Sequence, residues 1–196
     1  MKARWVTVYL IVVVASTLLD TCTTFLLSPD LRHEANPVVM HLGRSWTVLL
    51  LIKGIGIVVS GLLFYAGLAI LQTRRHGGLE SGGFLAPLSW SLFRRETSLL
   101  RFCFGMPRDM TALLGIILLS GASAIVMGNL VAGMVNSVTL FTSKTIISPW
   151  GCWAIVGVSG TILTIVLANT FLRSTQIAEP VSGANRCPSQ QLRRHG

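Results

Sequence analysis

The hydrophobic residues of this chain gather in four long runs that are separated by more polar segments. The runs cover residues 5–27, 46–72, 110–135 and 150–172. About 20 consecutive apolar residues are enough for an α-helix to cross the hydrocarbon core of a bilayer. Backbone groups find no water there, so a spanning segment is a helix or a barrel strand, and the runs lack the alternation of barrel strands. The pattern predicts an all-α integral membrane bundle of four transmembrane helices.

The remaining segments complete this picture. The first run exceeds the 7–15 apolar residues of a signal peptide, so we expect it to stay as a membrane anchor. Over 88–104 a helix would be amphipathic, with Ser91, Arg94, Ser98 and Arg101 on one face and Leu88, Leu92, Leu99 and Cys103 on another. This favours a helix on the membrane surface, with an irregular basic loop as the alternative. Residues 1–173 form the predicted membrane domain, and 174–196 a disordered basic tail.

Composition agrees with a membrane protein, and the distribution of charge suggests its orientation. Of the 196 residues only 12% are charged, whereas soluble domains carry about 25%. The net charge is +9, and the N-terminal flank, the link over 73–109 and the residues from 173 onward hold two, six and four of the 16 Lys and Arg residues. Cytoplasmic loops are enriched in Lys and Arg, so we expect both termini and this basic central link in the cytoplasm. There the link would contact anionic lipid, and nucleic acid is not an expected partner.

Two charged residues lie inside hydrophobic runs, Asp20 in the first and Lys53 in the second. Asp20 would share one helical face with Ser16, Thr23 and Thr24, and this face should turn toward other helices. Each charged residue lies seven positions from the outer end of its run. At about 1.5 Å per residue, both lie about 10 Å deep. If the two helices are antiparallel neighbours, an Asp20–Lys53 pair forms.

The link between the first two runs supplies further polar candidates. Asn36 followed by Pro37 is typical of a helix start. The candidate polar site comprises Asp20, Thr24, Glu34, Asn36 and Lys53. His33, Glu34 and His41 could offer metal ligands, but their spacing matches no zinc pattern, so neither a metal nor a cofactor is expected.

Small and amide side chains indicate how the helices would pack. Gly56 and Ser60 suit a close helix contact, and so do four further glycines and their small neighbours: Gly121, Ala124, Gly128, Ala132, Gly157, Gly160, Thr161 and Thr164. Asn129 and Asn136 are seven residues apart and favour interhelical hydrogen bonds. Cys22 and Cys152 would lie toward the same side of the membrane, and we expect separate buried thiols there, with a disulfide as the alternative.

One group of these residues resembles a known family. Asp20, Thr24, the segment Glu34-Ala35-Asn36-Pro37 and Lys53 follow a D…T…E-x-N-P…K pattern. This pattern resembles that of small multispan bacterial and archaeal membrane proteins of unknown function. The resemblance covers residues 15–60 and implies a compact helical domain in a prokaryotic cell membrane, with no established reaction. The long basic central link departs from the family's pattern.

Three functions fit this sequence. The first is a non-enzymatic accessory or structural protein, in which the polar cluster of Asp20, Glu34 and Lys53 holds the helices and a membrane protein is the partner. The second is a small transporter or a protein that handles ions or protons, and its few helices would require a homo-oligomer. The third is a membrane enzyme acting on lipid or a small molecule, with Glu34 or His33 as acid or base. The first is the expected function.

Overall fold

The computed structural model describes residues 2–31, 37–43, 45–73, 86–93, 105–142 and 149–177. Its helices are α1 (Lys2–Leu27), α2 (Pro37–His41), α3 (Trp46–Thr73), α4 (Ala86–Phe93), α6 (Met110–Thr142) and α7 (Pro149–Ile177). Four of these, α1, α3, α6 and α7, contain segments that are long and apolar enough to cross a membrane. The predicted all-α fold with four long apolar helices is therefore confirmed.

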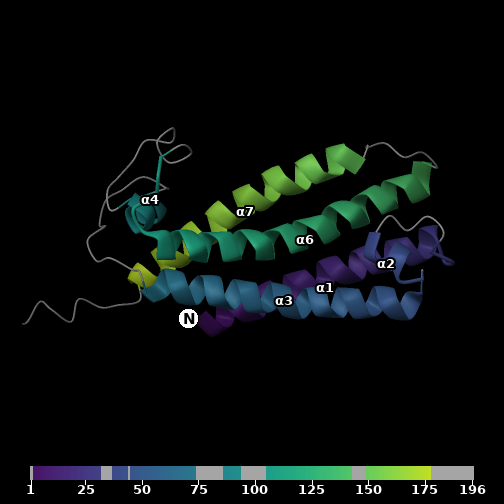
Figure 1. Ribbon diagram of the computed structural model, residues 1–196, viewed down its shortest axis with the longest axis horizontal. Helices are drawn as coiled ribbons and strands as arrows, with labels where there is room; N and C mark the ends of the chain where they lie inside the picture. Colours follow the sequence, from purple (N-terminus) through teal and green to yellow (C-terminus); the bar gives the residue numbers. More distant parts are fainter. Residues whose placement is uncertain are drawn as a thin grey trace, which may run out of the picture.

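The long helices lie side by side, and α4 lies at one end of the bundle (Figure 1). Helix α6 packs against α1, α3 and α7, so it is the centre of the arrangement. Contacts between Thr24 and Asn136 and between Thr17 and Asn129 show that α1 and α6 run in the same direction. Helix α3 runs the opposite way to α1, because Lys53 contacts Asp20 near the end of α1, whereas Ser60, later in α3, contacts Tyr9 earlier in α1.

Helix α6 begins at a capping residue and continues beyond the predicted hydrophobic run. The Asp109 carboxylate accepts hydrogen bonds from the backbone N–H groups of Thr111 and Ala112, at 3.1 and 3.0 Å. These N–H groups have no partner within the helix, so Asp109 is an N-cap. At its other end α6 continues to Thr142, beyond the hydrophobic run that ends at residue 135. Its 33 residues span about 50 Å, more than a hydrocarbon core of about 30 Å.

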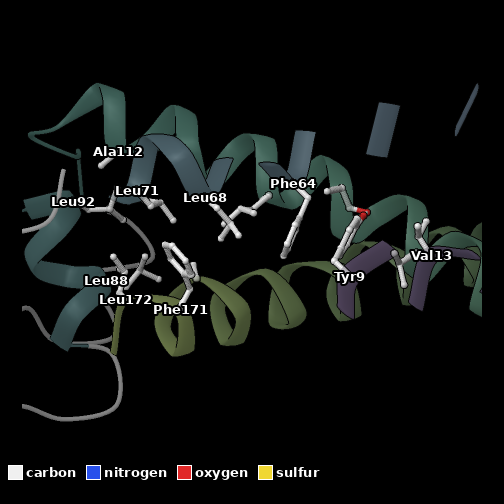
Figure 2. Packing of buried hydrophobic residues seen from close by; sticks show 14 of the residues in the cluster. Tyr9, Val13, Phe64, Leu68, Leu71, Leu88, Leu92, Ala112, Phe171 and Leu172 are labelled. Carbon is white, nitrogen blue, oxygen red and sulfur yellow. The ribbon is translucent and has the colours of Figure 1, made fainter. Parts of the chain in front are cut away.

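A core of buried apolar side chains fills the half of the bundle nearer α4. Figure 2 shows Phe64 and Leu68 of α3 lying between Tyr9 and Phe171, with Leu71 farther toward α4. The rings of Tyr9 and Phe64 are stacked, with centroids 3.9 Å apart. Large apolar side chains elsewhere on the long helices are exposed, as expected where a helix faces lipid.

Close helix contacts occur at some of the predicted small residues and not at others. A Cβ atom built on Gly67 would lie 2.8 Å from the Gly115 carbonyl oxygen, so α3 and α6 approach closely there. Gly160 faces Ala124, as expected. Gly56, Gly128 and Gly157, however, have no atom within 4 Å of a built Cβ, so the close contacts predicted there are wrong. The spacing of residues along a helix does not show which of several stripes of small residues faces a neighbouring helix.

The predicted amphipathic segment is helical over α4, and residues 94–104 lie outside the described part of the chain. Helix α4 packs against α6 and α7. The backbone N–H groups of Arg108 and Asp109 donate to the Leu92 carbonyl oxygen, at 2.8 and 3.1 Å, which connects α4 to the start of α6. Ser91, expected on the polar face, is buried and donates to the Pro87 carbonyl oxygen instead. The placement of α4 at the membrane surface stays a prediction.

Candidate functional site

Helix α1 turns a polar face toward its neighbours. Ser16, Asp20, Thr23 and Thr24 are all buried, as the helical spacing predicts. Each hydroxyl on a transmembrane helix can bond to a carbonyl of the preceding turn, which limits the cost of placing it away from water. Ser16 donates to the Val13 carbonyl oxygen and Thr23 to that of Leu19. The Asp20 carboxylate has no hydrogen to donate to a carbonyl of its own helix, because an ionised carboxylate only accepts hydrogen bonds. It therefore needs a donor from another helix.

Lys53 of α3 is that partner. Its ammonium group donates a hydrogen bond to Oδ2 of Asp20, and the two side chains form an ion pair. The side chains of Lys53 and Asp20 are 19% and 7% exposed, so the pair is largely shielded. An isolated charge in an apolar interior is very unfavourable, whereas a paired and hydrogen-bonded one is tolerated. The predicted Asp20–Lys53 pair is therefore confirmed.

Asn129 connects this ion pair to α6. The Lys53 ammonium donates to Oδ1 of Asn129 at 3.2 Å. The amide nitrogen of Asn129 in turn donates to the Thr17 hydroxyl oxygen at 2.9 Å. Thr17, Asp20, Lys53 and Asn129, from three different helices, form what we call the polar network. The prediction that Asn129 makes interhelical hydrogen bonds is confirmed, and so is that for Asn136, which donates to Thr24 at 3.1 Å.

Of the remaining members of the predicted site, the structure describes Thr24, which bonds outside this network. Thr24 lies one turn after Asp20 and bonds to Asn136. Glu34, Asn36 and His33 lie outside the described residues, so their place in one site with Asp20 stays a prediction. His41 is exposed at the end of α2. Within the described ranges, no three His, Cys, Asp or Glu side chains lie where they could hold one metal ion.

Contacts of aromatic side chains hold α1 and α3, which form the first helical hairpin, together near the polar network. The indole N–H of Trp46 donates to the Pro29 carbonyl oxygen at 2.6 Å. Its ring also meets Phe25 edge-on, with centroids 5.3 Å apart. These contacts join the end of α1 to the start of α3. The hairpin therefore brings Asp20 and Lys53 to the same depth.

A second polar contact inside the bundle was not predicted from the sequence. The Tyr9 hydroxyl donates to the Ala122 carbonyl oxygen at 2.8 Å and is also hydrogen-bonded to the Ser60 hydroxyl. The Tyr9 hydroxyl thus connects α1, α3 and α6 at a different depth in the bundle from the polar network. The Tyr9 hydroxyl inside an apolar run was the sign of this contact in the sequence. Its acceptor is a backbone carbonyl oxygen, and a pattern of side chains does not identify such an atom.

The two cysteines that the structure describes are both free. Cys152 is partly exposed, and Cys22 is exposed on the outer surface of α1. The expectation of separate thiols is confirmed, but the expectation that Cys22 is buried is wrong. Cys22 lies two residues after Asp20, and this spacing places the two on different faces of a helix.

The fold and the ion pair between helices define a multi-pass integral membrane protein. No protein-family model, curated protein or solved structure matches this chain. The resemblance to small multispan prokaryotic membrane proteins therefore identifies no family.

Proposed function

We propose that this chain is a non-enzymatic accessory or structural membrane protein, in which the polar network fixes how α1, α3 and α6 pack. The observation that carries the proposal is the mutual pairing of the network. Asp20 accepts from Lys53, and Lys53 also donates to Asn129. Asn129 donates to Thr17. Each of these polar groups is hydrogen-bonded to a group on another helix of the same chain, as expected of groups that join helices.

The proposal is tested by thermal unfolding in mild detergent of wild type, Asp20→Asn, Lys53→Met and the double variant. Removing one partner of a buried ion pair typically costs about 3–5 kcal/mol, and replacing both can be nearly neutral. We expect each single variant to be strongly destabilised and the double variant to recover. Lys2→Met is the matched control, because Lys2 lies over the exposed Tyr65 ring at 4.0 Å, away from the network. Equal stability of all four proteins would contradict a structural role.

A small oligomeric transporter, or a protein that handles ions or protons, is the second candidate. It is favoured by the Lys53 side chain, which keeps 19% of its surface exposed within a span. Ionisable groups inside membranes are frequently part of ion or proton pathways. This function predicts that the double variant is stable but loses ion or proton flux in proteoliposomes. The structural proposal predicts unchanged flux and a co-purifying membrane protein for both wild type and double variant.

We also propose that both termini and the basic central link face the cytoplasm of a bacterial or archaeal cell. Described basic residues at the end where α1 begins support this orientation: Lys2, Arg4, Arg108 and Arg173. The positive-inside rule places such an end in the cytoplasm, where the link would meet anionic lipid. Fusing a reporter that is active only in the cytoplasm to each terminus tests the orientation. An inactive reporter at either terminus, with the fusion inserted normally, would contradict it.

A further inference from the structure

Asn169 of α7 differs from the other asparagines that the structure describes. Its side chain is completely buried, at 0% exposure. Neither the amide nitrogen nor the amide oxygen has a hydrogen-bond partner. By contrast, the Asn129 and Asn136 amides both donate to threonine hydroxyls of α1. Asn169 is thus a wholly buried amide that no other protein group satisfies.

Such a group needs a partner. Transfer of an amide into apolar surroundings without a hydrogen bond is unfavourable, and bulk water cannot reach it inside the bilayer. Buried polar groups in native proteins are bonded either to protein or to ordered water. Ser123, also buried and unbonded, makes a weaker case, because rotating one side-chain bond can bring its hydroxyl to a carbonyl of its own helix. The amide of Asn169 needs an acceptor for its nitrogen and a donor for its oxygen at the same time.

The surroundings of Asn169 restrict the kind of partner. Its neighbours in sequence Ala168, Phe171 and Leu172 are buried in the apolar core, and Figure 2 shows Phe171 and Leu172 pointing into it. The partner must therefore be small, and it must both donate and accept hydrogen bonds. A metal cation would bind the amide oxygen alone and leave the NH₂ group unbonded. Water meets both requirements, and internal waters typically bond to about three buried polar groups.

We propose that Asn169 binds an internal water molecule. The site is separate from the polar network. Phe171, two residues after Asn169, meets the ring of Trp5 near the start of α1. Asp20 lies 15 residues beyond Trp5 on the same helix, which corresponds to about 22 Å. The bound water therefore places a further polar position in the half of the bundle that holds the apolar core.

The test uses the full-length protein in detergent, labelled with ¹⁵N only at asparagine. The chain has five asparagines, so its side-chain amide spectrum is simple. The Asn169 signal is assigned as the one that disappears in Asn169→Leu, or in Asn169→Gln if the leucine variant does not fold. We expect a cross-peak between the Asn169 amide protons and water whose sign reports a residence time of nanoseconds or longer. This cross-peak should vanish in the variant while the other asparagine signals persist.

An assigned Asn169 amide without a water cross-peak would overturn the proposal. A coupling across a hydrogen bond from the Asn169 amide nitrogen to a protein acceptor would overturn it as well, because the amide would then be bonded within the protein. Neither outcome bears on the Asp20–Lys53 pair, which is tested by other variants.

Discussion

Asn129 donates a hydrogen bond to Thr17, and the two residues are 112 positions apart in the chain. One heptad later, Asn136 and Thr24 repeat the same bond with the same separation. One heptad earlier, Tyr9 reaches the Ala122 carbonyl oxygen at a separation of 113. Helices α1 and α6 are thus parallel and meet every seven residues, the repeat of left-handed coiled-coil packing. Polar contacts at a fixed interval can set the register of such a pair.

Replacing Asn129 with leucine should destabilise the protein more than replacing Asn136. Both changes remove an interhelical bond, worth about 0.6 kcal/mol on average and up to about 1.7 in membrane proteins. Asn129→Leu also removes the second acceptor of the Lys53 ammonium. Unfolding in detergent measures the difference. Ser137→Ala is the control, because its hydroxyl bonds only within α6 at Gly133. Equal losses at both asparagines would argue against a special role for Asn129.

Gly67→Ala should be destabilising by about 1–3 kcal/mol, the usual cost of overpacking. The added Cβ would lie 2.8 Å from both the Gly115 carbonyl oxygen and Leu119, so α3 and α6 would have to move apart. Gly56→Ala on the same helix is the matched control. No atom lies within 4 Å of its Cβ position, and alanine favours the helix by about 0.5–1 kcal/mol. In thermal unfolding, Gly67→Ala should therefore melt at a lower temperature than wild type and Gly56→Ala at a higher one.

Tyr9→Phe should lower stability by about 1 kcal/mol, because it removes the bonds to Ser60 and Ala122 and keeps the ring. Tyr9→Leu should cost more, since it also removes the stacking against Phe64. Unfolding curves of both variants, compared with Ser60→Ala, measure the two contributions. If phenylalanine is neutral, the hydroxyl does not stabilise the contact between α1 and α6.

Asp109→Ala should destabilise the start of α6 by about 0.5–2 kcal/mol, the usual effect of losing an N-cap. The carboxylate accepts from two N–H groups that the helix itself leaves unpaired. Asp109→Asn retains a good capping side chain and serves as the control. Hydrogen exchange of the amides of Thr111 and Ala112 is the local readout, and it should accelerate only in the alanine variant.

The candidate site was predictable only in part. A charged residue inside an apolar run is rare and has to be paired, so Asp20 and Lys53 could be paired from their matching depth. Thr17 and Asn129 could not be added to them, because their contact depends on α1 and α6 being parallel neighbours. Thr17 was not among the residues of the predicted polar face, and it is nonetheless buried. Gly56 shows the same limit, since a small residue permits a close contact without showing that a neighbour is there.

The sequence by itself determined that this is a membrane protein with four long apolar helices, because the thickness of a bilayer sets the length of a spanning run. It also predicted the Asp20–Lys53 pair for antiparallel neighbouring helices, because a buried charge without a partner is too unfavourable to persist. The tertiary structure decided that α6 lies at the centre, that Asn129 completes the polar network and that α4 is buried against α6 and α7. These features depend on which faces meet. Where lipid is as apolar as the side chains, hydrophobic pattern alone cannot select those faces.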